Sequence, residues 1–164
     1  RIKEVVMRHP EISYVVNLQG DEPLIKPESI DVVAKNVKED KLADISTLIR
    51  KITPEEAENP NLVKCVVDNL GFAMYFSRSK IPFERNVGKS DFYGHLGIYG
   101  YKRDALIRMT ELPQSSCEMS ESLEQLRALQ NGMKIKTSVV DFIPVGIDTI
   151  EDLEKFKSII SVKS

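Results

Sequence analysis

An apolar segment that stops abruptly at a glycine turn is the feature that most constrains what this chain can fold into. Residues 15–18 have the composition of a short buried strand, and the turn Gly20-Asp21-Glu22-Pro23 follows them. Pro23 favours an extended conformation for Glu22, which fixes the direction in which the loop leaves the strand. In open α/β sheets, ligands bind beyond the carboxyl ends of strands, where loops converge on a rigid scaffold. We therefore expect a chemical site at this turn.

The carboxylate of Asp21 suits a magnesium ion. Mg²⁺ is a hard cation that usually takes only one or two protein carboxylates and completes its shell with water and substrate phosphates. Asp in a loop has a commoner role, however, because it often caps the following helix or stabilises a turn. Taken alone, the turn favours this structural role over metal binding.

Length and composition set the class of the protein. The chain has 164 residues, of which 41% are hydrophobic, and this is enough for one globular domain with a sizeable core. The formal net charge is -2 and basic and acidic residues are interspersed, which argues against a dedicated nucleic-acid-binding protein. No apolar run approaches the roughly 20 residues that span a bilayer. We therefore expect a cytoplasmic protein with no membrane or nucleic-acid partner.

Helical and strand patterns alternate along the chain. Apolar residues recur at helical spacing in residues 1–8, in a segment that begins at Pro27, in residues 120–130 and in a last helix whose inward stripe is Leu153, Phe156 and Ile160. In and just before this segment we expect Met119, Leu123 and Leu126 to face inward, with Glu121, Glu124 and Gln125 on other faces. Strands are expected over residues 43–49, 62–68, 72–77, 94–101 and 135–142. These patterns predict an α/β fold with a mixed, mostly parallel sheet and an antiparallel hairpin through Asn69-Leu70-Gly71.

The strand at residues 94–101 has two chemically different faces. Side chains alternate across a strand, so Leu96 and Ile98 share an apolar face. The opposite face can form hydrogen bonds and carries His95, Gly97, Tyr99 and Tyr101. A lone histidine is usually structural, but the shared polar face favours a binding surface.

Five segments of the chain, in the same order, resemble the C-terminal two-thirds of the CMP-Kdo synthetases, which are 3-deoxy-manno-octulosonate cytidylyltransferases. The segments are VVNLQGDEPLI (15–25), NPNLVKCVVDNLGFAMYFSRSKIPFER (59–85), HLGIYGYKRDALI (95–107), ESLEQLRALQNG (121–132) and GIDTIEDLE (146–154). The resemblance implies a fold of the nucleotide-diphospho-sugar transferase type. It also implies a cytoplasmic homodimer that uses CTP and Mg²⁺ to convert Kdo into CMP-Kdo for lipopolysaccharide biosynthesis, with release of pyrophosphate.

The resemblance gives roles to two aspartates. Asp21 and Asp148 match the family's two Mg²⁺-binding aspartates and would be the catalytic residues here. Held from separate loops, the metal would help neutralise phosphate and sugar carboxylate charge while the anomeric hydroxyl attacks the α-phosphate in line. Asp148-Thr149-Ile150-Glu151 also fits a capping box at the start of the last helix. The sequence identifies no general base.

A sugar acid needs a cation for its carboxylate and several polar groups for its hydroxyls. Arg78 matches the family's carboxylate-side arginine, although the residues alone also allow an exposed charge at the hairpin end. The resemblance assigns the remaining sugar-facing positions to Gln19, His95, Tyr99, Glu124 and Gln125. Without the resemblance, Gln19 would be interpreted as a residue that forms a hydrogen bond in a turn. Glu124 and Gln125 would be interpreted as part of a solvated helix face.

One family feature has no match in this chain. The CMP-Kdo synthetases begin with a strand and a glycine-containing loop, rich in Arg, Ser and Lys, that cradles the triphosphate. We therefore expect residues 1–164 to form a single domain that is incomplete at its N-terminal side and does not turn over efficiently alone. Two alternatives stay open: a cytidylyltransferase for another 3-deoxy-keto-sugar acid, and a catalytically inert dimerisation or binding fragment.

Overall fold

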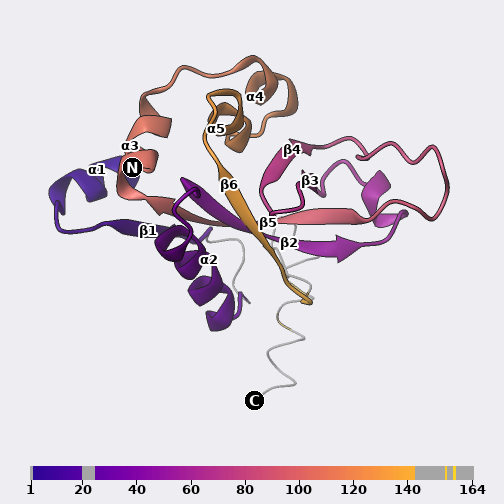
Figure 1. Ribbon diagram of the computed structural model, residues 1–164, viewed down its shortest axis with the longest axis horizontal. Coiled ribbons are helices and arrows are strands. Elements are labelled where there is room, and N and C mark those ends of the chain that lie inside the picture. The colour runs from indigo at the N-terminus through magenta and orange to yellow at the C-terminus, as the bar shows by residue number, and fades with distance from the viewer. Residues whose placement is uncertain (1, 20–24, 143–153, 155–156, 158–164) are drawn as a thin grey trace.

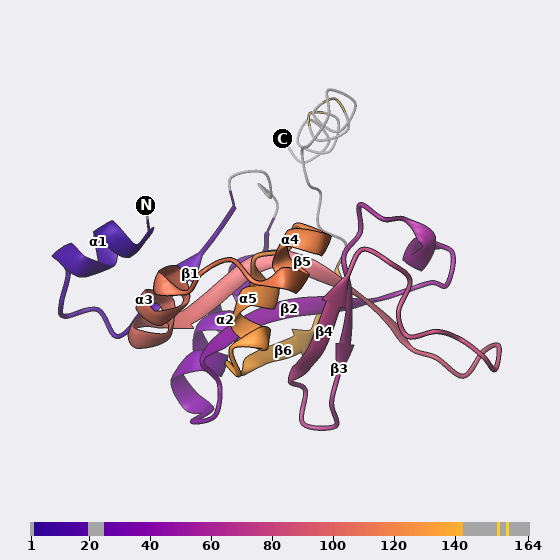
Figure 2. The same ribbon diagram turned by 90° about the horizontal axis from the view of Figure 1, so that it is seen from above.

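The alternating strand patterns and the apolar helix stripes fold into a mixed six-stranded sheet with helices on both faces (Figure 1, Figure 2). The computed structural model describes residues 2–19, 25–142, 154 and 157. Helix α2 packs on one face of the sheet, and α3 and α5 pack on the other. The elements in chain order are α1 (Ile2–Arg8), β1 (Tyr14–Asn17), α2 (Pro27–Glu39), β2 (Ile45–Ile52), η1 (Glu56–Glu58), β3 (Lys64–Val67), β4 (Ala73–Ser77), β5 (Phe92–Lys102), α3 (Arg103–Glu111), α4 (Ser116–Glu121), α5 (Gln125–Gln130) and β6 (Ile135–Val139).

Strand β5 organises the sheet because it pairs along both of its edges. One edge pairs antiparallel with β2, and the other pairs antiparallel with β1 near one end and with β3 near the other. β4 extends the sheet as an antiparallel hairpin with β3, and β6 pairs parallel with β2. The predicted mixed α/β sheet and its hairpin are confirmed. The expectation of mostly parallel pairing is wrong for the described strands, because β5 runs opposite to each of its three neighbours.

The two faces of β5 belong to different layers, as the alternation predicts. Leu96 and Ile98 are buried under α2 with Val33. Gly100 permits this close approach, because a Cβ there would lie 2.6 Å from Ser46 Oγ and 2.7 Å from Val33 Cγ1. The opposite face of β5 lines a pocket with His95, Gly97, Tyr99 and Tyr101.

The prediction of one helix over residues 120–130 is wrong. Ser122 lies in the left-handed region, at φ 54 and ψ 48, and this conformation ends α4 before α5 begins. Met119, which was expected to face inward, is 62% exposed, whereas Gln125, which was expected on another face, is only 6% exposed. The break therefore changes which side chains the second helix directs into the protein.

Several sequence predictions lie outside the described residues. They concern the turn that carries Asp21, the proposed metal ligand Asp148, and the last helix with Leu153, Phe156 and Ile160. Among the residues that the structure does describe, no helix is long and apolar enough to cross a membrane.

Candidate functional site

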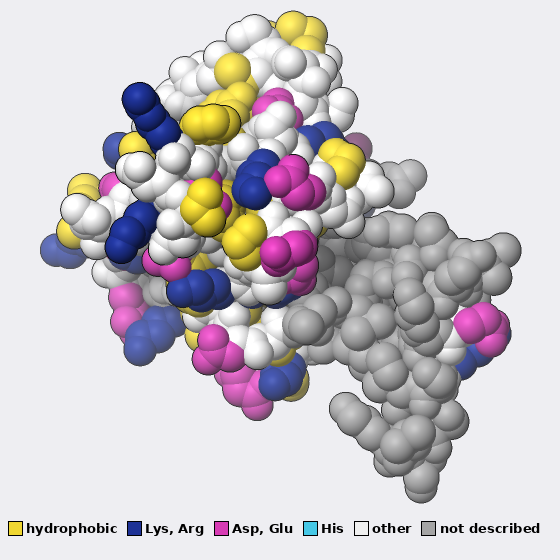
Figure 3. All heavy atoms as spheres, turned by 90° about the vertical axis from the view of Figure 1, so that its right-hand side faces the viewer, with side chains coloured by type: hydrophobic (Ala, Val, Ile, Leu, Met, Phe, Trp, Pro, Cys, Tyr) yellow, Lys and Arg dark blue, Asp and Glu magenta, His cyan; other side chains and the backbone are white. Residues whose placement is uncertain are grey.

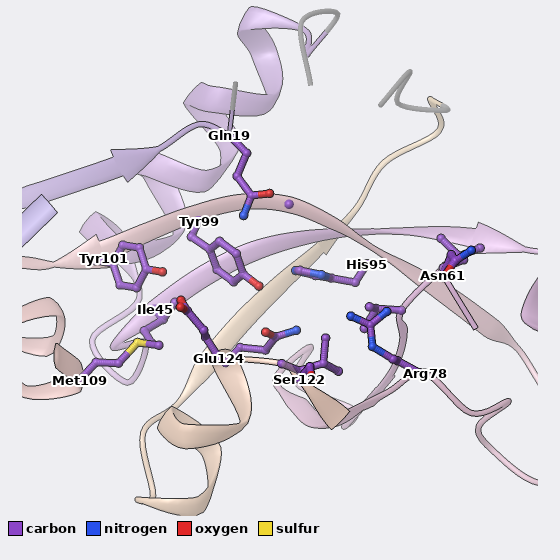
Figure 4. Close-up of a pocket in the computed structure, with 15 residues that line it drawn as sticks. Gln19, Ile45, Asn61, Arg78, His95, Tyr99, Tyr101, Met109, Ser122 and Glu124 are labelled. Carbon is purple, nitrogen blue, oxygen red and sulfur yellow. The ribbon is translucent and has the colours of Figure 1, made fainter. Parts of the chain in front are cut away.

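A pocket of about 410 Å³ opens on the face of the sheet that carries the polar side of β5 (Figure 4). Its walls come from parts of the chain that are distant in sequence: the end of β1, the loop before β3, the end of β4 and the break between α4 and α5. It brings together all six residues that the resemblance assigns to the substrate, namely Gln19, Arg78, His95, Tyr99, Glu124 and Gln125. These predicted residues therefore surround one space.

A row of rings from β5 forms one wall of the pocket. The centroids of His95 and Tyr99 are 5.3 Å apart, and those of Tyr99 and Tyr101 are 6.0 Å apart in a stacked arrangement. Phe76 meets His95 edge-on at 5.0 Å from the β4 side. Figure 4 shows Gln19 reaching toward Tyr99 from the end of β1. The i, i+2 spacing on a regular strand produces this row, because it places these side chains on one face.

The imidazole of His95 in this pocket is neutral. Burial lowers the pKa of His95 to about 3, so the ring carries no charge near neutral pH. Its Nε2 lies 2.9 Å from Thr47 Oγ1, a buried hydroxyl on β2. Within the described part of the chain, Nδ1 has no hydrogen-bond partner. The ring therefore offers that nitrogen to a ligand.

Arg78 is anchored at the end of β4 instead of extending into solvent. Its Nε donates to the carbonyl of Glu121 at 2.8 Å, and its Nη1 donates to the carbonyl of Pro60 at 3.3 Å. The Glu121 carboxylate in turn accepts from the Arg78 backbone N–H at 2.9 Å and from the Ser77 hydroxyl at 2.6 Å. Among the described residues, Nη2 has no partner. One donor edge of a positioned guanidinium thus faces the pocket region.

A buried lysine holds the backbone of Arg78 in place. Lys64 is 0% exposed, and its Nζ donates to the carbonyls of Asn59 at 2.8 Å and Arg78 at 2.5 Å. Burial lowers the pKa of this amine, and the charge of Glu121 acts in the opposite direction. Lys64 therefore ties the loop before β3 to the end of β4, two of the pocket walls.

In the part of the chain that the structure describes, the Gln125 side chain brings an amide without a protein partner to the pocket. The residue is 6% exposed and lines the pocket, and its side-chain amide has no hydrogen-bond partner among the described residues. A polar ligand or water in the pocket would satisfy it. Glu124, the preceding residue, is exposed and adds a carboxylate at the pocket rim.

Three further polar residues line the pocket that the sequence did not assign to the ligand: Asn61, Tyr101 and Ser122. The strand alternation placed Tyr101 on the correct face without deciding whether it packs or binds. Burial and the nearby charge of Glu124 raise the pKa of the Tyr101 phenol, so it stays protonated and can donate a hydrogen bond. Nothing in the sequence indicates that the chain breaks at Ser122, because serine seldom adopts a positive φ.

The pocket combines one cation with neutral donors and acceptors and a carboxylate, which suits a polyhydroxylated anion. Within the described residues, no group of three or more His, Cys, Asp or Glu side chains is placed to hold a metal ion. The predicted ligands Asp21 and Asp148 lie outside those residues. The described residues of the pocket therefore supply groups that can hydrogen-bond to such an anion.

The sequence of this chain is similar to those of known proteins. A cytidylyltransferase family model matches residues 1–135. The 3-deoxy-manno-octulosonate cytidylyltransferase of Fusobacterium nucleatum is 45% identical over 156 residues, which are 94% of this chain and 64% of that protein. The protein of the same name from Thermodesulfovibrio yellowstonii is 50% identical over 151 residues, which are 88% of this chain and 59% of that protein. The chain therefore spans about three-fifths of the length of these curated relatives.

Two solved structures share the fold. A CMP:2-keto-3-deoxy-manno-octonic acid synthetase complexed with CTP aligns with a TM-score of 0.94 and 38% identity, covering 99% of this chain and 67% of that one. A Bacillus anthracis structure named for glucose-1-phosphate thymidylyltransferase, in complex with sucrose, aligns with a TM-score of 0.60 at 13% identity, covering 96% of this chain and 56% of that one. The second similarity concerns the fold alone. The family-model match and the relatives together show that the chain belongs to the cytidylyltransferase family.

Proposed function

We propose that this chain forms the sugar-acid pocket of a 3-deoxy-manno-octulosonate cytidylyltransferase. The reaction joins CMP from CTP to the anomeric hydroxyl of Kdo and releases pyrophosphate, as a step of lipopolysaccharide biosynthesis. One observation carries the proposal: the Gln125 amide and the anchored Arg78 guanidinium keep unpaired donors at a single pocket. Matching names among the relatives support the choice of sugar.

In this proposal each polar side chain has a distinct task. Arg78 binds the Kdo carboxylate through the edge of its guanidinium that contains Nη2, because a planar fork matches a carboxylate. His95 Nδ1 and the Glu124 carboxylate accept hydrogen bonds from sugar hydroxyls, and the Gln125 amide both donates and accepts hydrogen bonds. The pocket thereby orients the anomeric hydroxyl. Much of the rate enhancement then comes from positioning and from charge stabilisation.

We also propose that Asp21 and Asp148 hold the Mg²⁺ ion. Carboxylate oxygens are the donors that Mg²⁺ prefers, and two protein carboxylates match its usual coordination beside nucleotide phosphates. When bound, the ion would supply charge neutralisation for the phosphates and the sugar carboxylate. This chain's described residues would orient the Kdo molecule next to it.

Direct binding tests the sugar assignment. We expect the chain to bind Kdo at least about tenfold more tightly than N-acetylneuraminate, measured by isothermal titration calorimetry, because a polar pocket rejects a ligand that leaves its groups unpaired. Equal or reversed affinities would favour a cytidylyltransferase for another 3-deoxy-keto-sugar acid. Pyrophosphate release from CTP and Kdo is then measured with any in-frame coding sequence upstream of Arg1 included. Kdo binding without release under those conditions would favour a catalytically inert binding fragment.

The metal assignment has its own measurement in the same active preparation. Asp148→Asn should raise the Mg²⁺ concentration for half-maximal pyrophosphate release by at least about tenfold, since loss of even an outer partner of a metal ligand costs 10–100-fold in affinity. Asp152→Asn, which changes a nearby carboxylate on the same segment, serves as the control. An unchanged Mg²⁺ midpoint in Asp148→Asn would favour helix capping as the role of this residue.

A homodimer in the cytoplasm is the remaining part of the proposal. CTP is a cytoplasmic nucleotide, which supports the location. The β3–β4 hairpin exposes Leu70 at 67% and Met74 at 62%, and the face in Figure 3 shows hydrophobic side chains exposed between interspersed charges. Burial of these apolar side chains in a subunit interface would be favourable. Light scattering on the purified chain measures the mass, and a monomer at micromolar concentration would contradict the dimer.

A further inference from the structure

Thr47 lies at an irregularity between β2 and β5. It pairs with Tyr99, but the next residue, Leu48, pairs with Leu96, so two residues of β5 are skipped. The Thr47 hydroxyl fills this irregularity and lies 2.7 Å from the Ile98 carbonyl and 3.2 Å from the Leu96 carbonyl. Its side chain is 0% exposed, so water does not compete for these contacts. Thr47 also lies outside the set of residues that line the pocket.

The single hydroxyl proton of Thr47 decides the direction of its contact with His95. The two carbonyl oxygens can only accept, and an O···O distance of 2.7 Å to Ile98 requires the proton between them. If the proton pointed at His95 Nε2 instead, the Thr47 and Ile98 oxygens would face each other at that distance without one. The hydroxyl oxygen must therefore accept at 2.9 Å from an N–H on Nε2.

We propose that Thr47 is a positioning residue that fixes His95 as the Nε2–H tautomer and so leaves Nδ1 as a hydrogen-bond acceptor for a ligand hydroxyl. A neutral imidazole has one N–H and one lone pair, and the partner of one nitrogen determines the role of the other. The part that concerns the ligand rests on the proposed function, whereas the tautomer is a property of the free protein.

The surroundings of the ring keep this assignment stable near neutral pH. Phe76 and Tyr99 contact the ring, and neither offers a carboxylate that would favour a charged imidazole. Among the described residues that line the pocket, Glu124 is the one that carries a carboxylate, and burial of the ring keeps the pKa of His95 low. The lone pair on Nδ1 therefore remains available as a hydrogen-bond acceptor across the physiological pH range.

The tautomer can be measured directly, without substrate. The chain contains two histidines, so a long-range ¹H–¹⁵N spectrum of the labelled chain shows two imidazoles, and a His9→Gln variant leaves only His95. We expect His95 in the Nε2–H form. Thr47→Val keeps the shape without the hydroxyl and should raise the Nδ1–H population, whereas Thr47→Ser should restore the wild-type spectrum.

The affinity of the same variants for Kdo tests whether His95 Nδ1 accepts a hydrogen bond from the ligand. We expect Thr47→Val to raise the Kd for Kdo about tenfold and Thr47→Ser to stay within about threefold of wild type. An Nδ1–H form in the wild-type chain would overturn the proposal even if Thr47→Val does not fold. A folded Thr47→Val with an unchanged tautomer, or with a shifted tautomer and unchanged Kdo affinity, would also overturn it. If the wild-type chain binds no Kdo, the proposed function fails, and the wild-type and Thr47→Val spectra still decide the tautomer.

Discussion

Arg78→Gln should raise the Kd of the chain for Kdo by about 10²–10³-fold. Removing one partner of a desolvated, hydrogen-bonded charge pair costs about 2–5 kcal/mol, and each 1.4 kcal/mol is tenfold in affinity. The guanidinium is already anchored on Glu121 and Pro60, so little conformational entropy is lost when a carboxylate binds to its remaining edge. Calorimetric titration with Kdo measures the change.

Two further variants make this result specific. Arg78→Lys keeps the charge but loses the planar fork, so we expect an intermediate loss of affinity. Arg85→Gln removes an exposed positive charge from the loop between β4 and β5, outside the pocket, and should leave the Kd within about twofold of wild type. Circular dichroism checks that each variant is folded. A folded Arg78→Gln that binds Kdo within threefold of wild type would show that the carboxylate binds elsewhere.

The strand that forms the pocket wall could be predicted because its signal is local. Alternation along residues 94–101 placed His95, Tyr99 and Tyr101 on one face, and side-chain period on a strand is fixed by backbone geometry. The β3–β4 hairpin was predicted for the same reason, from turn residues between two apolar runs. The resemblance then supplied the residues from distant segments, which periodicity cannot bring together.

The features that the sequence did not predict depend on tertiary context. Residues 120–130 have the periodicity of one helix, but Ser122 adopts a left-handed conformation that no local pattern indicates. Lys64, in a strand, would ordinarily be solvated, yet two backbone carbonyls hold its ammonium group inside the protein. The irregularity at Thr47 likewise depends on how β2 and β5 meet. The conformations and hydrogen bonds of these residues form only when distant parts of the chain pack together.

Arg127→Met should destabilise the fold by about 3–5 kcal/mol, because it would leave the charge of Glu118 buried without its partner. Glu118 is 4% exposed, and its carboxylate accepts from Arg127 Nε at 2.8 Å and from Nη2. The same carboxylate closes the capping box of α4 by accepting from the Ser115 backbone N–H. Urea unfolding at neutral pH measures the loss. Lys35→Met, in an exposed pair with Glu39, is the matched control and should change stability by less than about 1 kcal/mol.

The pH dependence of this penalty distinguishes a lost ion pair from lost packing. In the wild type, the hydrogen bonds from Arg127 hold the pKa of Glu118 below its ordinary value. The ion pair therefore contributes stability above the unfolded pKa of about 4.3, and this contribution declines as pH falls through the folded value. In Arg127→Met the unpaired carboxyl can escape its penalty by binding a proton. The stability difference between wild type and variant should therefore be largest near pH 7 and shrink toward pH 4. A difference that stays constant over that range would mean that Arg127 contributes through packing of its stem, and the Glu118→Gln/Arg127→Met double variant would then be no more stable than Arg127→Met alone.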